Sequence, residues 1–511
     1  MNTASPSRPS LCGRHANYAL REFPYPARIA VLALASALAL AAPQARADAE
    51  AQLVYRNGTV LTMDAQDRMA QAVAVRDGKI LAVGQNEDVG RLIGAGTRVV
   101  DLAGKTLIPG IYDAHSHLSL TGIWGMFDAN LNSPPIGSVK TMDDLLALLR
   151  AQQTKVGADS WVTGMGYDDS LLAEKRHPTR ADLDQISATQ PIVITHISGH
   201  FAVANSAALA VAGITAQTPN PDGGVIRRDA KGEPNGVLEE TALYKVTQRR
   251  PALSDAQLQQ ALRYASRMYA ERGVTTANDG ASRPVNMRAL ESLARAGELP
   301  VRVMAWPMLE TMKEIDQIEF KSGRIKIGGI KDFADGSIQG YTGYLSQPYH
   351  TPHHGDEGYK GFPRQDREKL AERVKTVYRA GRQSLIHANG DQAISDVLYA
   401  FRKAQEAYPR KDARPVVIHS QMAREDELDE MKALGAIPSF FVLHTYYWGD
   451  RHRDVFIGPE RASRISPTRS ALERGMRFTL HTDTPIVPME PMRLIWSAVN
   501  RTSTSGATIG A

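Results

Sequence analysis

Cysteine is almost absent from this chain of 511 residues, which contains Cys12 and no other. A single cysteine excludes an internal disulfide and any zinc site that needs several thiolates. Long apolar runs are also scarce. Only the stretch 29–42 is continuously apolar, and no later stretch is long enough to span a membrane. The hydrophobic share of 43% still excludes a disordered or collagen-like chain, and the length supports a sizeable buried core.

A strong charge imbalance is missing from most of the chain. Lys and Arg total 60 against 55 for Asp and Glu, which gives a formal charge of +5. Residues 1–47 alone hold five arginines and one glutamate, so the remaining residues are close to neutral. A basic surface that would favour nucleic acid is therefore not indicated. We expect a small-molecule substrate and no nucleic-acid partner.

The first 47 residues have the pattern of a cleavable export signal. Arginines precede the apolar run 29–42, and the small residues Ala45 and Ala47 follow it. Secretory signals show these features in the same order. The run is also shorter than the roughly 20 residues that cross a bilayer, so no membrane anchor is expected. We predict a periplasmic or secreted protein; a buried core helix is the alternative for this run.

Residues 48–109 have the pattern of short strands and tight turns. The segments 53–63 and 72–83 are rich in β-formers and carry Asn57-Gly58 and Asp77-Gly78 near their centres. Such pairs between apolar residues are strong hairpin signals. We therefore predict a hairpin at each pair, in a small β unit that is not a complete domain.

From about residue 265 onward, short apolar strands alternate with amphipathic helical stretches. This alternation predicts a parallel sheet, and eight strands are the number that closes a (β/α)8 barrel. The fold class is therefore predicted as α/β, with a barrel over 110–511 that carries an insertion at about 119–265. The eight predicted strands are 107–111, 274–277, 301–305, 325–333, 384–387, 416–419, 437–441 and 478–480.

The first of these strands ends in a pair of histidines separated by one residue. Alternate residues of a strand point to the same side, so His115 and His117 can face one ion together. Imidazole nitrogens are ligands for zinc, although such a pair also occurs at solvated strand ends. The pair alone therefore leaves both readings open.

Further polar residues lie on the later strands. His387, His419 and Asp483 stand at strand ends, and Lys331 lies within the strand 325–333. The carboxyl ends of barrel strands converge on one face, so these side chains are expected to gather beside the first histidine pair. Four imidazoles and a carboxylate suit zinc or a similar divalent ion. The sequence therefore predicts a metal site.

Six motifs in order across most of the chain carry a family resemblance: LIPGIYDAHSHL, ISGHFAVANSAAL, KDFADGSIQGYTGYL, LIHANGDQAI, PVVIHSQM and FTLHTDTPI. They resemble the amidohydrolase superfamily, in particular its N-substituted formamide deformylase-like metal-dependent hydrolases. The resemblance implies a (β/α)8 barrel with a small flanking β-sandwich. It also implies two divalent ions, expected to be Zn²⁺, bridged by a carbamylated lysine. The implied ligands are His115, His117 and Asp483 for one ion, His387 and His419 for the other, and Lys331 as the bridge.

Lys331 would need this modification because a bare ammonium repels a cation, whereas a carbamate formed with CO₂ is an anionic oxygen ligand. A salt bridge from Lys331 to Asp332 or Asp335 is the alternative. Lys326 on the same predicted strand competes for the role.

The parts together predict hydrolysis of a C–N bond in a small non-peptide amide, such as an N-substituted formamide or another N-acyl compound. Asp483 is expected to take the proton of the attacking water and to deliver it to the leaving nitrogen. Hydrolysis of a cyclic amide or an ester is the alternative within enzymes. A non-catalytic regulator of exoenzyme production on the same scaffold is the alternative outside them.

Other polar and aromatic residues are candidates for contacting substrate. His200 and His196 lie in the insertion, where a structural role is equally expected. The aromatic group after the seventh strand is expected to wall an apolar pocket for an N-substituent. The loop histidines His350, His353 and His354 are expected to be solvated rather than to bind a third metal. The remaining candidates are Tyr341 and Thr342, followed by Tyr446, Tyr447, Trp448 and His452.

The chain ends soon after Asp483, where similar proteins continue with a segment that completes the β-sandwich. We therefore expect an incomplete sandwich over residues 48–109, with an exposed strand edge and apolar face. A truncated reading frame or a fragment would explain this, and so would cover by a second subunit in a homo-oligomer.

Overall fold

The computed structural model describes residues 50–510, so the predicted export segment 1–47 and Cys12 lie outside the described residues. The chain divides into two compact units, and the division falls between Pro109 and Gly110. No helix within 50–510 combines the length and apolar character needed to cross a bilayer.

Between residues 50 and 109, the smaller unit contains two sheets and one short helix, α2 (Asn86–Gly90). The first sheet has the strand order β5-β4-β1-β6 and the second has the order β3-β2-β7. Two small groups of buried apolar side chains lie in this unit. One contains Val54 and Ala74 of the first sheet, and in the other Val60 and Ala70 of the second sheet pack with Val73 of the first. The strands are β1 (Leu53–Arg56), β2 (Thr59–Leu61), β3 (Met69–Ala70), β4 (Ala72–Arg76), β5 (Lys79–Gly84), β6 (Arg98–Asp101) and β7 (Thr106–Leu107).

Only one of the two predicted hairpins is present in this unit. Asp77 and Gly78 have positive φ values of 50° and 70° and join the antiparallel strands β4 and β5, as predicted. The hairpin predicted at Asn57-Gly58 is wrong, because β1 and β2 belong to different sheets. Gly58 is needed there for another reason: a Cβ at this position would lie 2.6 Å from the carbonyl oxygen of Lys105. The pair marks a chain crossing between sheets.

The larger unit is built on two parallel sheets, with the strand orders β17-β16-β15-β8 and β18-β19-β20-β21-β22. All eight predicted barrel strands have counterparts here. The strand predicted at 325–333 is split at Gly328-Gly329, where a Cβ on Gly329 would lie 2.4 Å from the side chain of Leu385. The strands are β8 (Ile111–Tyr112), β15 (Val274–Ser282), β16 (Arg302–Pro307), β17 (Ile325–Ile327), β18 (Ile330–Phe333), β19 (Ser384–Ala388), β20 (Val416–His419), β21 (Ile437–Phe440) and β22 (Thr479–Leu480).

Backbone contacts link the two sheets at both ends. A parallel bridge joins Met308, just after β16, to Lys331 in β18. At the other end, the N–H of Asp483 donates to the carbonyl of His115 at 3.1 Å, and the N–H of His117 donates to the carbonyl of Thr484 at 2.7 Å. The first and last strands therefore meet, as they do in a (β/α)8 barrel, and the α/β fold class is the predicted one.

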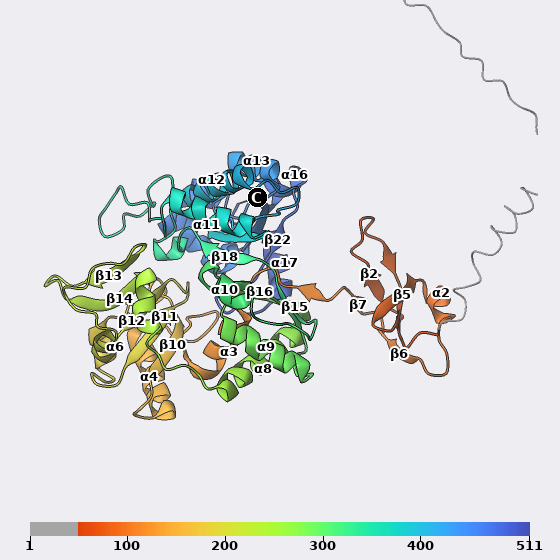
Figure 1. Ribbon diagram of the computed structural model, residues 1–511, viewed down its shortest axis with the longest axis horizontal. Coiled ribbons are helices and arrows are strands. Elements are labelled where there is room, and N and C mark those ends of the chain that lie inside the picture. Colours follow the sequence, from red (N-terminus) through yellow and green to blue (C-terminus); the bar gives the residue numbers. More distant parts are fainter. Residues whose placement is uncertain (1–49, 511) are drawn as a thin grey trace, which may run out of the picture. The chain divides into compact units, whose positions relative to one another are not determined.

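Helices cover the outer faces of these sheets (Figure 1), and their apolar sides form two large clusters of buried side chains. Helix α8 shows how the sequence determines where a helix of this layer begins and which of its faces is buried. The Ser254 hydroxyl accepts the N–H of Gln257, and Leu258, Leu262 and Tyr269 recur on one face and are buried. The helices are α3 (Leu118–Phe127), α8 (Asp255–Glu271), α9 (Pro284–Arg295), α10 (Met312–Ile315), α11 (Arg367–Arg379), α12 (Asp391–Ala407), α13 (Glu425–Leu434), α14 (Leu443–Arg451), α15 (Gly458–Ala462), α16 (Thr468–Glu473) and α17 (Pro491–Asn500).

The segment between α3 and α8 forms a separate six-stranded sheet, with the strand order β13-β14-β12-β11-β10-β9. Helices α3 and α8 pack against each other through Gly122 and Ala261, so both ends of the predicted insertion belong to the barrel's helical layer. The strands are β9 (Ala129–Asn130), β10 (Val162–Tyr167), β11 (Ile192–His196), β12 (Phe201–Ala204), β13 (Gly224–Arg228) and β14 (Pro234–Glu240). The helices are α4 (Met142–Val156), α5 (Arg180–Asp184), α6 (Ser206–Val211), η2 (Thr241–Leu243) and α7 (Tyr244–Thr247).

Candidate active site

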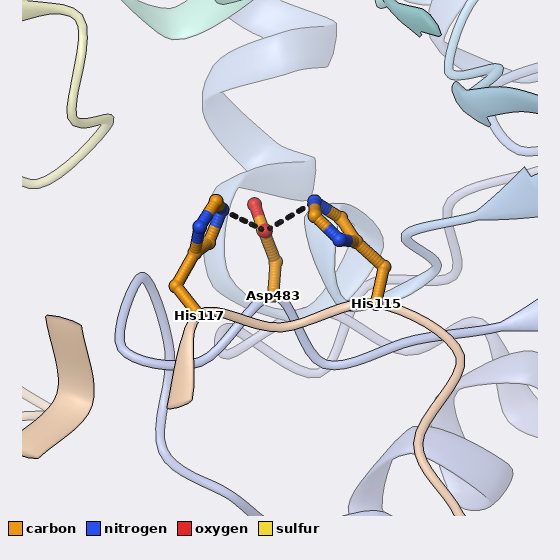
Figure 2. A group of neighbouring side chains, drawn as sticks. All are labelled: His115, His117 and Asp483. Atoms are coloured by element: carbon orange, nitrogen blue, oxygen red, sulfur yellow. Dashed lines mark ion pairs between the residues drawn. The ribbon is translucent and has the colours of Figure 1, made fainter. Parts of the chain in front are cut away.

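His115, His117 and Asp483 converge where the first and last barrel strands meet (Figure 2). Asp483 Oδ1 lies 3.3 Å from His115 Nε2 and 3.4 Å from His117 Nε2. His117 Nδ1 lies 2.8 Å from the carbonyl oxygen of Gly280, and His115 Nδ1 lies 3.2 Å from Asn278 Oδ1. These contacts fix both rings so that their Nε2 atoms face the carboxylate, which is how neighbouring groups orient metal-binding imidazoles.

The donor set of these three residues fits a divalent ion. Asp483 Oδ1 is buried and has no hydrogen-bond partner within the described residues, although it lies between two imidazoles. Two ligands about 2.1 Å from a tetrahedral ion lie roughly 3.4 Å apart, and the two nitrogen–oxygen distances here match that separation. The three ligand atoms also lie within 4.8 Å of one another. The group therefore has the chemistry and the spacing to hold zinc or a similar ion.

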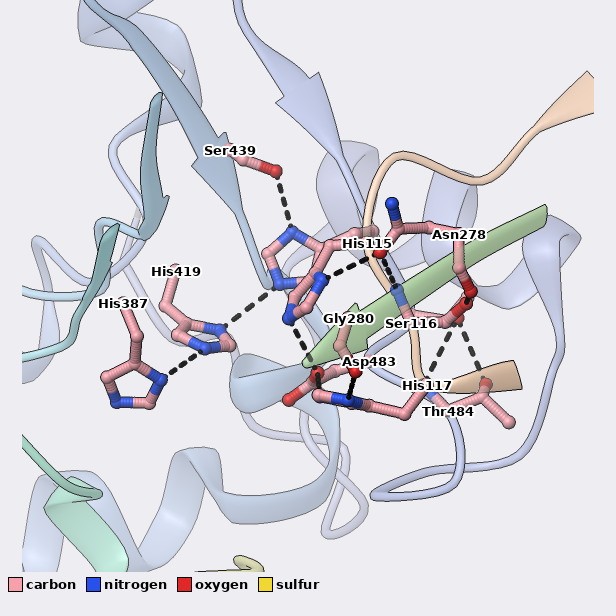
Figure 3. Close-up of polar contacts among 12 residues, drawn as sticks. His115, Ser116, His117, Asn278, Gly280, His387, His419, Ser439, Asp483 and Thr484 are labelled. Carbon is pink, nitrogen blue, oxygen red and sulfur yellow. Dashed lines mark hydrogen bonds and ion pairs between the residues drawn. The ribbon is translucent and has the colours of Figure 1, made fainter. Parts of the chain in front are cut away.

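A row of imidazoles continues from this group across the barrel (Figure 3). His387 Nδ1 lies 2.9 Å from His419 Nε2, and His419 Nδ1 lies 3.2 Å from His481 Nε2. The row ends at the Ser439 hydroxyl, which lies 2.9 Å from His481 Nδ1. The structure thus brings His387 and His419 beside the first group, as the sequence predicted. His481 was missed, although its spacing of two residues from Asp483 repeats that of His115 and His117.

Burial holds the imidazoles in their neutral form. It lowers the pKa of His115, His387 and His419 well below 6.5, and nearby imidazoles and Lys331 lower it further. Burial opposes ionisation of Asp483, but the neighbouring His117, His481 and Lys331 outweigh it and lower the pKa of this carboxyl. Neutral imidazoles beside an ionised carboxylate are the protonation states that metal binding requires.

Lys331 points into the same group from β18. Its Nζ lies 3.0 Å from His115 Nε2, and the residue is 1% exposed. Burial lowers the pKa of Lys331 to about 7, although the charge of Asp483 acts to raise it. The competing Lys326 is exposed on β17. Of the two lysines, only Lys331 therefore reaches the histidines, and much of its amine is uncharged near neutral pH.

A cavity of about 620 Å³, including its opening to solvent, connects these residues to the insertion. His117, Lys331 and Asp483 line this cavity, and so does His200 of the insertion. His200 Nδ1 lies 2.9 Å from Glu240 Oε2, and its ring lies 5.0 Å from that of His387. Glu240 was not predicted, because no periodicity or motif marks this residue of the insertion.

The other predicted substrate-binding residues lie away from this cavity. Tyr341 packs against Tyr349 and His353, and Tyr446 packs against Trp496 of α17. Trp448 is buried, and its Nε1 donates to Asp168 Oδ2 at 3.2 Å. None of the three predicted residues lines the cavity. For Tyr446 and Trp448 the reason is that α14 turns these side chains toward α17 and the insertion.

Two other groups of metal-ligating residue types lie outside this centre. Asp168, Asp169 and His196 have ligand atoms within 4.8 Å of one another, but Arg451 already pairs with Asp168 at 2.8 Å. Within residues 50–510, the loop histidines 350, 353 and 354 form no group of three ligands with such spacing.

Comparison with known proteins gives consistent matches over most of the chain. A model of the amidohydrolase family matches residues 98–510. The N-substituted formamide deformylase of Arthrobacter pascens is 28% identical over 478 residues, which cover 89% of this chain and 85% of that protein. The exoenzymes regulatory protein AepA of Pectobacterium carotovorum subsp. carotovorum is 27% identical over 400 residues, covering 76% and 83%. The crystal structure of an uncharacterized metal-dependent hydrolase from Pyrococcus horikoshii OT3 aligns with a TM-score of 0.70 and 25% identity, covering 89% and 87%.

Proposed function

This chain belongs to the amidohydrolase family and is a metal-dependent hydrolase of carbon–nitrogen bonds, and we propose that it acts on small non-peptide amides such as N-substituted formamides or N-acyl compounds. The observation that carries this proposal is Asp483 Oδ1, which is buried between two imidazoles without a hydrogen bond from any described residue and belongs to a residue that lines an open cavity. The likeness to a formamide deformylase supports the substrate class.

Each residue of the centre has a distinct part in the proposed reaction. His115, His117, His387, His419 and Asp483 would hold the metal. A divalent ion bound there polarises a carbonyl and lowers the pKa of a water molecule. Asp483 accepts a proton as water adds to the carbonyl carbon, and it returns this proton to the nitrogen as the C–N bond breaks. His200, whose Nδ1 lies 2.9 Å from Glu240 Oε2, would donate to the substrate.

We further propose that the centre holds two zinc ions and that Lys331 is carbamylated. The uncharged Lys331 amine would add to CO₂, forming an N–C bond and releasing one proton. Its position 3.0 Å from His115 Nε2 supports this role. Mass spectrometry of the intact protein under bicarbonate, with and without the Lys331→Ala substitution, tests it. A bicarbonate-dependent mass increase of one CO₂ should appear in the wild type alone; its absence there would contradict the modification.

Metal analysis combined with a substrate screen tests the function. We expect about two ions per chain and hydrolysis within a panel of formamides, N-acyl amines, lactams and esters. Turnover restricted to lactams or esters would favour the alternative enzyme class. Metal-loaded protein with no turnover of any of these bonds would favour a regulatory role, which the likeness to an exoenzyme regulator supports.

We also propose export to the periplasm or beyond the cell, on the pattern of residues 1–47. Cell fractionation with N-terminal sequencing of the mature protein tests this, since a cut after Ala47 is expected and an intact N-terminus would contradict it.

A further inference from the structure

The cavity wall carries an arginine that neither the sequence motifs nor the metal centre account for. Arg364 lines the cavity together with Lys331, His200 and Asp483. Its N–H donates to the carbonyl of Ala334 at 2.8 Å, just beyond β18. On the other side, a Cβ at Gly223 would lie 2.1 Å from the Arg364 carbonyl oxygen. The main chain of Arg364 is therefore wedged between the barrel and the insertion.

Aromatic rings hold the side chain of Arg364 in place. Its Cζ lies 4.5 Å from the centre of the Phe333 ring and 5.5 Å from that of Tyr244. One guanidinium nitrogen donates to the Tyr244 hydroxyl at 3.2 Å. Lys331 Nζ lies 4.9 Å from the centre of the same Phe333 ring. The guanidinium is thus fixed one aromatic ring away from the metal centre.

Among the described residues, no carboxylate pairs directly with this guanidinium, although the charges of Glu240 and Asp332 act on it from farther away and, against the effect of burial, raise the pKa of Arg364. Within residues 50–510, no carboxylate lies within 4.0 Å of Arg364, whereas the nearby Arg373 pairs with both Asp332 and Glu310 at 2.6 Å. Glu240 lines the same cavity, but its Oε2 already contacts His200. A half-buried guanidinium with one neutral partner keeps most of its N–H donors free, and the planar fork of these donors suits a carboxylate.

We propose that Arg364 binds a carboxylate on the substrate, so that the preferred substrates are formamides or other amides whose N-substituent bears this group. This inference rests on the proposed hydrolase function and specifies its substrate class. In the reaction, water adds to the acyl carbon and the C–N bond breaks. The acyl group leaves as a carboxylate, and the amine takes up the proton. The substrate's own carboxylate stays on Arg364 throughout and fixes the amide over Asp483.

Matched substrates separate this role from a structural one. N-formyl-leucine and N-formyl-leucinamide have nearly the same shape but differ in charge, and formate release measures turnover of both. We expect Arg364→Gln to lower kcat/KM for the acid about 10- to 100-fold, the range for a lost charged hydrogen bond, with little effect on the amide. Arg364→Lys should retain part of the preference. Arg414→Gln, at an exposed arginine paired with Asp412, is the control that should change neither.

Turnover of N-formyl-leucinamide also shows whether a variant is folded, because a variant that has lost its structure would cleave neither the acid nor the amide. Equal loss for acid and amide, or no loss for either, would overturn the role of Arg364. A wild type that cleaves the amide as well as the acid would overturn the substrate class while leaving the proposed function intact.

A binding measurement decides the point without turnover. In the metal-loaded Asp483→Asn variant, calorimetry should find the acid bound at least about tenfold more tightly than the amide. That difference should disappear when Arg364→Gln is added. If the acid binds equally well without Arg364, its carboxylate is held elsewhere and the inference fails. If the acid binds more tightly through Arg364 but the wild type cleaves neither compound, the proposed function fails while the carboxylate-binding site is supported.

Discussion

Asp113 offers a quantitative test of the electrostatics around the centre. This carboxyl is buried, and its Oδ2 has no hydrogen-bond partner in the described part of the chain. Burial raises the pKa of Asp113 to about 7 from 3.8, and the charge of Asp483 adds to the increase. The folded protein therefore holds a proton on Asp113 over a pH range in which the unfolded chain has already lost it.

The sign of the effect follows from this difference. A raised pKa in the folded state contributes stability that is present below about pH 4 and is lost as the pH rises through about 7. The full difference is worth about 4 kcal/mol, of which roughly 2–3 kcal/mol falls between pH 5 and pH 8. Asp113→Asn removes the titration. The free energy of unfolding of this variant, relative to the wild type, should therefore rise by roughly that amount over the same interval.

Urea denaturation followed by circular dichroism at pH 5, 6, 7 and 8 measures the effect. Both proteins are compared at each pH with the same metal loading, so that protonation of the histidines cancels. Asp412→Asn, at an exposed carboxylate, is the matched control and should show no such trend. A pH-independent difference between Asp113→Asn and the wild type would refute the reasoning.

Three further predictions concern the centre and its support. Asp483→Asn should leave metal bound through the histidines but lower kcat about 10²- to 10⁴-fold by removing the proton acceptor; near-wild-type turnover in a metal-loaded sample would refute that role. Gly122→Ala should destabilise the protein by about 1–3 kcal/mol, because the new Cβ would lie 2.2 Å from a backbone oxygen of α8. Gly125→Ala on the same helix meets only the half-exposed ring of Tyr264 and should cost less in thermal denaturation; equal losses would contradict the packing argument. Glu240→Gln should lower kcat more than it changes metal content, since it loosens the imidazole that it holds, and loss of metal instead would assign it a structural role.

The sequence was most informative where local pattern and topology coincide. Alternating strands and helices predicted the barrel, and convergence of strand ends predicted that His115, His387 and Asp483 would meet. The same strand logic could have found His481. In each case, the position of the side chain follows from its place on a strand.

The failures share a different cause, because they concern residues whose direction is set by distant partners. Tyr446 and Trp448 lie on a helix whose aromatic faces contact α17 and Asp168 rather than the cavity. Glu240 and Arg364 reach the cavity only through packing between the insertion and the barrel, which leaves no periodic signal. The Asn57-Gly58 pair carried a strong local turn signal, but the strands on either side of it, β1 and β2, pair with strands of different sheets.

The hydrogen bond from Asp483 to His115 gives the centre a particular place in folding. The contact that closes the ring of strands is also the contact that brings the proton acceptor to its histidines, and its two residues are far apart in the chain. Strand–helix pairs along the way can form early from nearby segments, but this junction needs nearly the whole barrel sequence. Recovery of turnover during refolding should therefore lag behind recovery of helical signal. An activity assay would time the closure of the barrel, which spectroscopic probes of secondary structure miss.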